Sequence, residues 1–340
     1  MRAFALIREL ENTSVARVRA ERQQVTHWRP GADHAVQRQR AALLADLRNY
    51  FAQHHIMEVE TPLLCRAGVS DPALENFAVP CGTEMRFLQT SPEYAMKRLL
   101  AAGSGDIFQI CKAFRLEEQG ARHNPEYTLL EWYRLGIDHY QLAREVGELV
   151  AAVLERPGWQ VWSWPALFQE VLGTGAHSAS REDLEQLASR RLGEIPLGLE
   201  RDDLFDLLMS HCVEPAIAGW GIVLVVDYPE SQAALARQIV NVMGEPCGAR
   251  FECYADGVEL ANGYWECGDA AELRARFAAD NSLRHTRGQM SRSPDEQLLG
   301  ALSAGLPSCA GVALGVDRLL ALQTGAQDLD AVLSFAWSRS

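Results

Sequence analysis

The chain has 340 residues, 48% of them hydrophobic, and a formal net charge of −13. The apolar fraction is typical of a globular protein with one large or two ordinary domains. The acidic balance argues against broad, non-specific binding of nucleic acid. No run of about 18 apolar residues is present, so we expect no membrane span. The early acidic residues also argue against a secretory signal.

The eight cysteines form no Cys-x-x-Cys pair and show no cysteine–histidine spacing typical of zinc sites. Cys247, Cys253 and Cys267 are the nearest to a cluster. They fall on predicted strands, where a buried free thiol is the usual state of cysteine. Free thiols indicate a reducing, cytoplasmic location.

Residues 1–35 show no regular hydrophobic period and include the break signal Trp28-Arg-Pro-Gly31. We interpret them as a disordered extension outside the fold, although their arginines also fit a local basic patch. The next segment, 36–55, has the spacing of a helix with Leu43, Leu47 and Phe51 on one side. Residues 59–62 then have the pattern of a strand that proline ends.

Residues 90–103 are predicted to form a helix with clear boundary signals. Ser91 is expected at the N-cap, Pro92 at the first helical position and Gly103 just past the end. Glu93 lies in the first turn, where a carboxylate is favoured by the helix dipole.

Residues 107–115 and 127–133 are two β-rich runs joined by a polar loop with glycine and proline. The loop end carries four polar side chains: Arg115, Glu117, Arg122 and His123. A guanidinium matches phosphate oxygens bidentately, and a carboxylate two residues away lies on the same strand face. From the pattern alone, a phosphate-rich ligand and a solvated ion pair remain alternatives.

Residues 141–154 and 203–212 have helical patterns, but the sequence reveals no chemistry between 135 and 220. Residues 221–227 form a predicted buried strand. Residues 249–266 are predicted to form a hairpin that turns at Asp256-Gly257, because this dipeptide is a strong hairpin signal.

Glu259 and Glu266 lie in the second half of this hairpin, separated by a flexible Asn-Gly pair. Two carboxylates beside a triphosphate suit Mg²⁺, which prefers oxygen ligands. Two surface glutamates are the alternative. Helices are predicted at 269–287 and 295–304, before a glycine-rich stretch at 311–318.

Three stretches, in this order, resemble motifs 1, 2 and 3 of the class II aminoacyl-tRNA synthetases in their lysyl-type form. They are 43–64 with Pro62, 114–133 with Phe-Arg-x-Glu, and Gly311-Val-Ala-Leu-Gly-Val-Asp-Arg318. The resemblance spans about residues 36–338. It implies an α+β fold, a class II synthetase catalytic domain over 36–340 with an antiparallel β-sheet flanked by helices. It also implies a homodimer with two-fold symmetry, formed through motif 1.

The resemblance further implies a site for ATP and an amino acid. It assigns ATP to Arg115, Leu116, Glu117, His123, Asn124, Tyr127, Glu259, Leu260, Gly315 and Arg318. It assigns the amino acid to Ser91, Pro92, Glu93, Tyr133, Glu266 and Ala313. Arg115 and Arg318 are the expected catalytic residues. Glu259 and Glu266 are the expected Mg²⁺ ligands, and Glu266 is also a candidate for a substrate ammonium group.

Within this family the chain resembles truncated lysyl-type paralogues that attach (R)-β-lysine to elongation factor P. Thirty-five residues before motif 1 are too few for the β-barrel anticodon-binding domain of lysyl-tRNA synthetases, so tRNA is not the expected partner. The resemblance implies an aminoacyl-adenylate made from ATP and an amide bond to a lysine of elongation factor P. Aminoacylation of tRNA and an inactive regulatory subunit remain alternatives.

One position departs from the lysyl-type motif 3, which has glycine where this chain has Ala313. The extra methyl is expected to fill space beside the amino-acid pocket. It would disfavour an ammonium group on the α carbon relative to the β carbon. One methyl group shifts selectivity by only ~1–3 kcal/mol.

Overall fold

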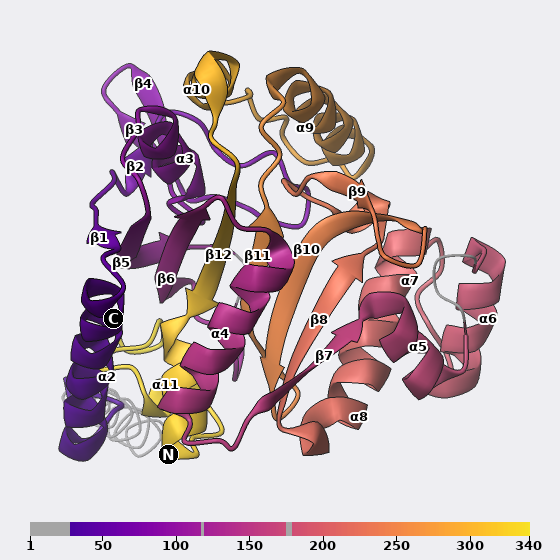
Figure 1. Ribbon diagram of the computed structural model, residues 1–340, viewed down its shortest axis with the longest axis horizontal. Coiled ribbons are helices and arrows are strands. Elements are labelled where there is room, and N and C mark those ends of the chain that lie inside the picture. The colour runs from indigo at the N-terminus through magenta and orange to yellow at the C-terminus, as the bar shows by residue number, and fades with distance from the viewer. Residues whose placement is uncertain (1–27, 117–118, 175–178) are drawn as a thin grey trace, which may run out of the picture.

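A nine-stranded sheet runs through the computed structural model, which describes residues 28–116, 119–174 and 179–340. Its order is β1-β5-β6-β12-β11-β10-β8-β7, with β9 paired to β10 (Figure 1). The strands are β1 (Met57–Glu58), β5 (Ile107–Phe114), β6 (Glu126–Leu135), β7 (Trp159–Ser163), β8 (Ile222–Tyr228), β9 (Gln238–Val240), β10 (Pro246–Ala255), β11 (Val258–Trp265) and β12 (Cys309–Gly315). The β1–β5 and β7–β8 pairs are parallel, and the central pairs are antiparallel. The predicted α+β class is confirmed.

Three helices cover one face of this sheet: α2 (His34–Gln53), α4 (His139–Val153) and α11 (Val316–Thr324). Strand alternation sends every second side chain into the core beneath them. On β6 these are Leu130 and Trp132, while Leu129, Glu131 and Tyr133 line a cavity on the opposite face. The same alternation on β12 leaves positions 311, 313 and 315 on the cavity side. The site is therefore built on one face of a sheet whose other face is packed.

A second core lies under the helices of the 164–217 region. These are α5 (Trp164–Leu172), α6 (Arg181–Leu192), α7 (Arg201–Leu208) and α8 (Glu214–Ile217), with a π-helical turn at Met209–Val213. Val223 and Val225 of β8 face this core, whereas Leu224 and Val226 face the first one. Burial on both faces explains why residues 222–226 of this strand form an unbroken apolar run.

The remaining elements lie together along the upper side of Figure 1. They are α3 (Glu93–Ala101), α9 (Ala270–Thr286), α10 (Glu296–Gly305) and a small sheet in the order β2-β4-β3 (Leu64–Cys65, Glu84–Leu88, Ala78–Cys81). α10 packs on both α3 and α9. No helix within the described part of the chain is long and apolar enough to cross a membrane.

Several predicted elements are confirmed with small shifts of their ends. The 249–266 hairpin is β10 and β11, and its turn residues Asp256 and Gly257 have φ angles of 50° and 73°. Positive φ at both positions is what a tight hairpin turn with right-handed strand twist requires. Gly103, with a φ of 89°, follows α3 as expected.

Two local predictions are wrong. The strand expected at 59–62 is instead the two-residue strand β1 at 57–58, which pairs in parallel with Ile107 and Phe108 at the start of β5. The Val59 amide donates to the Phe108 carbonyl at 2.9 Å, and residues 60–62 do not pair with β5. α3 begins at Glu93, so Pro92 occupies the N-cap and Ser91 lies outside the helix. The Ser91 hydroxyl still accepts from the Glu93 amide at 3.1 Å, but it donates to the Glu131 carboxylate at 2.6 Å.

Residues 28–35, the described part of the expected N-terminal extension, contact the C-terminal segment of the chain. The Gly31 and Ala32 amides donate to the carbonyls of Ser334 and Leu333, each at 2.9 Å. Helix α2 begins at His34, two residues before the expected start, with Asp33 as its N-cap. Residues 1–27 of the extension lie outside the described residues.

Candidate active site

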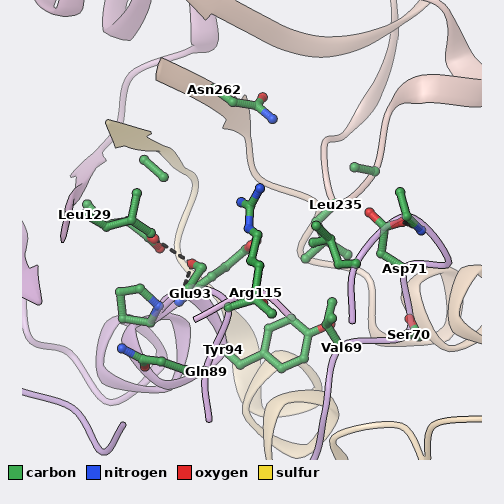
Figure 2. Close-up of a pocket in the computed structure, with 18 of the residues that line it drawn as sticks. Val69, Ser70, Asp71, Gln89, Glu93, Tyr94, Arg115, Leu129, Leu235 and Asn262 are labelled. Carbon is green, nitrogen blue, oxygen red and sulfur yellow. Dashed lines mark hydrogen bonds between the residues drawn. The ribbon is translucent and has the colours of Figure 1, made fainter. Parts of the chain in front are cut away.

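A cavity of about 1110 Å³ is lined by β6, β11 and β12, on the face of the sheet opposite to α2, α4 and α11. α3, α9 and the 69–74 loop form its other walls. Figure 2 shows Arg115 in the middle of this space, with its guanidinium directed toward Asn262, and with Asp71 and Leu235 on the opposite side from Glu93. Side chains from segments far apart in the sequence therefore share one chamber.

One end of the cavity contains three carboxylates, which we call the amine pocket: Glu93, Glu131 and Glu266. Glu131 is 2% exposed and accepts from the Ser91 hydroxyl at 2.6 Å and the Tyr133 hydroxyl at 2.7 Å. Burial, together with the charge of Glu93, raises the pKa of Glu131 to about 8. A carboxyl group in this state gains its charge most readily when a cation is brought beside it.

A buried ammonium group joins the other two carboxylates. The Lys97 Nζ atom lies 2.5 Å from Glu93 Oε1 and 2.6 Å from Glu266 Oε2. Burial alone would lower the pKa of Lys97, but the two carboxylates outweigh burial and raise that pKa above its ordinary value. Lys97 is therefore charged at neutral pH.

The opposite end of the cavity carries arginines. Arg318 begins on α11 and donates from Nη1 to the Glu259 carbonyl at 2.9 Å and from Nε to the Arg122 carbonyl at 3.3 Å. Its Nη2 lies 2.7 Å from His123 Nε2, and its guanidinium is 3.3 Å from the Glu259 carboxylate. These contacts hold the guanidinium at the cavity wall between β11 and the β5–β6 loop.

Arg115 leaves the end of β5 and lies over the Tyr127 ring, with 5.4 Å between its Cζ atom and the ring centroid. The Tyr127 hydroxyl donates to the Thr90 carbonyl at 2.8 Å, which fixes the ring. This guanidinium lines the same cavity as the amine pocket and Arg318. Its planar fork suits bidentate binding of an anion.

Two glycines of β12 differ in what their missing side chains would meet. A Cβ on Gly311 would lie 2.2 Å from a Tyr133 ring carbon and 2.5 Å from Glu266 Oε1, so the protein itself requires glycine there. A Cβ on Gly315 would meet no protein atom closer than 3.8 Å. Gly315 therefore leaves an open cradle next to Arg318, which suits close approach of a ligand.

The family model described as tRNA synthetases class II (D, K and N) matches residues 17–339. The chain belongs to the class II tRNA synthetase family. Its relatives include proteins named elongation factor P–(R)-β-lysine ligase from three bacteria. The Haemophilus influenzae PittGG protein is 42% identical over 318 residues, which cover 92% of this chain and 98% of the relative. The Vibrio campbellii protein is 44% identical, with 91% and 98% covered, and that of Pseudoalteromonas translucida is 43% identical, with 93% and 99% covered.

In this class II synthetase nearly all residues that the sequence assigned to the site line the same cavity. They are Ser91, Pro92, Glu93, Arg115, His123, Asn124, Tyr127, Tyr133, Glu259, Leu260, Glu266, Ala313, Gly315 and Arg318. Leu116 does not line it, and its amide instead donates to the Glu75 carbonyl at 2.8 Å. Glu117 lies outside the described residues. Asn124 lines the cavity, but its side chain bonds the Glu126 carbonyl and the Trp337 amide.

Sequence reasoning missed two residues of the site, Glu131 and Lys97. Glu131 lies within an apolar run of β6, Leu-Leu-Glu-Trp-Tyr, and Lys97 lies on α3 directly after the apolar pair Ala-Met. A charge at a position whose neighbours are buried is the signal that could have identified them, because buried charges are nearly always paired.

The two carboxylates predicted to bind Mg²⁺ have different surroundings. Glu266 is bound to Lys97 within the amine pocket, whereas Glu259 lies beside Arg318 at the arginine end. Among the described residues, no three His, Cys, Asp or Glu side chains come together as a metal cluster. Mg²⁺ commonly binds through one or two carboxylates and substrate phosphates, so Glu259 fits such an ion. The contacts of Glu266 favour its other predicted role, with a substrate ammonium group.

Proposed function

We propose that this chain joins (R)-β-lysine to a lysine side chain of elongation factor P, through an aminoacyl-adenylate made from ATP. The observation that carries the proposal is a single cavity with a buried carboxylate pocket at one end and two arginines along the rest. A diamino acid fits the first part, and a nucleotide triphosphate fits the second. The names of the relatives supply the identity of the amino acid and of its acceptor.

In the first step a carboxylate oxygen of the amino acid attacks the α-phosphorus of ATP. The bond between that phosphorus and the bridging oxygen breaks, and pyrophosphate leaves. Arg115 would bind the amino-acid carboxylate and the α-phosphate, and Arg318 would bind the terminal phosphate. No side-chain nucleophile is needed, because placement and charge neutralisation lower the barrier.

Glu259 would hold Mg²⁺ together with phosphate oxygens, next to the open cradle at Gly315. Bound Mg²⁺ would neutralise charge that develops on the leaving pyrophosphate. Tyr127, fixed by its bond to Thr90, would stack on adenine. Under this proposal the described residues would supply contacts for the phosphates and the adenine of ATP.

In the second step the ε-amine of the acceptor lysine attacks the adenylate carbonyl carbon. The bond from that carbon to the AMP oxygen breaks, the new amide forms, and the attacking nitrogen loses a proton. Glu93, Glu131 and Glu266 would retain the ammonium groups of the bound amino acid during this transfer. Ala313 stands opposite Glu131 and Asn262 in the sheet register, where its methyl narrows the space near the α carbon.

We further propose a homodimer and a cytoplasmic location. Met57 belongs to the two-residue edge strand β1, and Leu63 and Leu64 follow it in the chain. These three side chains are 38–50% exposed and would be covered by a second copy through motif 1. All eight cysteines are free thiols, as expected in a reducing compartment. Analytical ultracentrifugation tests the dimer, and a monomer at micromolar concentration would contradict it.

Exchange of radiolabelled pyrophosphate into ATP, dependent on (R)-β-lysine, tests the first step. An inactive regulatory subunit would give no exchange. Charging of tRNA with lysine by the same protein would favour the alternative activity over transfer to elongation factor P. We expect exchange with lysine isomers and no charging of tRNA.

A further inference from the structure

Lys97 is unusual in this chain on composition alone. Only two of the 32 lysine and arginine residues are lysines, Lys97 and Lys112. The Lys112 side chain is 41% exposed and pairs with Glu126 at 3.4 Å, whereas Lys97 has no exposed surface. A sequence that uses arginine almost everywhere has a lysine directly behind the amine pocket.

The geometry around Lys97 explains why a lysine suits this position. Its Nζ atom lies between a carboxylate of its own helix, Glu93, and one from the end of β11, Glu266. An ammonium group is a compact charge with three donors, and it fits between two carboxylates where a planar guanidinium would need more room. The neighbouring Met96 and Leu100 on α3 are buried as well.

Lys97 itself is not part of the cavity wall, but both of its partners are. A buried ion pair is weak support for fold stability, because well-packed apolar residues often do as well. The pairing instead fixes two carboxylates that face the cavity. Together with Glu131, they place three carboxylates in one small pocket. Their negative charges repel one another unless a cation is present.

We propose that Lys97 is a positioning residue that orients Glu93 and Glu266 toward the substrate and offsets one of the three carboxylate charges. Three carboxylates and one ammonium give a net charge of −2 when all are ionised. A diamino acid that is activated at its carboxylate carries two ammonium groups. The proposal rests on the proposed function and extends it to how the pocket selects a doubly charged amino acid.

The test variant is Lys97→Met, which keeps the length of the side chain and removes its charge. The KM for (R)-β-lysine in pyrophosphate exchange should rise, and kcat/KM should fall roughly 10²-fold, as for loss of one partner in a buried charge pair. The KM for ATP should stay within about twofold. The preference for β-lysine over 3-aminohexanoate, which lacks the distal amine, should shrink by roughly tenfold or more.

Lys112→Met is the matched control, because it removes the only other lysine from a partly exposed strand position. It should leave both KM values unchanged. A second measurement uses the parent protein. With ¹⁵N-labelled lysine, its two side-chain ammonium groups give at most two NMR signals. The slowly exchanging signal of Lys97 should shift when (R)-β-lysine is added, and ATP alone should leave it in place.

Parental KM and selectivity in a folded Lys97→Met variant would overturn the proposal. If that variant does not fold, an unmoved Lys97 signal with saturating (R)-β-lysine would overturn it instead. A parent protein without exchange for any lysine isomer would refute the proposed function itself, so the two failures are distinguishable.

Discussion

Arg318→Ala removes the guanidinium that reaches from α11 to the arginine end of the cavity. In the parent structure this group donates to the carbonyls of Glu259 and Arg122 and lies beside His123. Its ion pair with Glu259 joins side chains that are 23% and 38% exposed. A pair this accessible to water contributes only ~0–1 kcal/mol to stability.

The expected loss is therefore catalytic rather than structural. Removing one preorganised contact to developing transition-state charge lowers kcat by ~10²–10³. A stability loss of at most ~1 kcal/mol lowers Tm by no more than about 2–4 °C, because the shift per kcal/mol becomes smaller as the chain becomes longer. We expect the variant to fold, to keep its oligomeric state and to lose adenylate formation.

Pyrophosphate exchange at saturating ATP and (R)-β-lysine measures the effect, with Tm and sedimentation recorded in parallel. Arg274→Ala is the matched control, since Arg274 pairs with Glu296 on the surface and does not line the cavity. An exchange rate within about threefold of the parent in folded Arg318→Ala would refute the assignment of Arg318 to phosphate.

Four further substitutions probe the amine pocket and β12. Because burial raises the pKa of Glu131 to about 8, its carboxyl is largely protonated below that pH and must ionise to pair with an ammonium group. The KM for (R)-β-lysine should thus fall as pH rises through about 8, and Glu131→Gln should remove this part of the pH profile; an unchanged profile would contradict it. Gly311→Ala places a methyl against Tyr133 and Glu266 and should raise the amino-acid KM, whereas Gly315→Ala should raise the ATP KM, and the reverse pattern would exclude these roles. Ala313→Gly should increase kcat/KM for α-lysine relative to β-lysine by at most roughly 10–200-fold, measured by adenylate formation, and a constant ratio would place Ala313 outside the pocket.

Local sequence signals predicted the elements that depend on local physics. The hairpin at Asp256-Gly257 was predictable because a turn with positive φ favours these residues. The end of α3 before Gly103 was predictable for the same kind of reason. The motif resemblance added most of the cavity-lining residues, including Arg115 and Arg318.

Contacts between distant segments were not predictable in this way. Glu131 meets Ser91 across 40 positions of sequence, and Lys97 meets Glu266 only after β11 is placed beside β12. The packing of α3 and the residue before it against the sheet determines these contacts, and a short motif carries no information about it. The predicted start of α3 was wrong for a related reason. The Ser91 hydroxyl donates a hydrogen bond to Glu131 as well as accepting one from the Glu93 amide at the helix end.

The central claim is the transfer of an activated amino acid to elongation factor P. Its most direct test is mass spectrometry of purified elongation factor P after incubation with this protein, ATP, Mg²⁺ and either (R)-β-lysine or α-lysine. We predict one added lysyl group on a single lysine side chain, faster with (R)-β-lysine and absent without ATP. Unmodified elongation factor P, under conditions in which the same protein preparation catalyses pyrophosphate exchange and charges tRNA with lysine, would contradict the account.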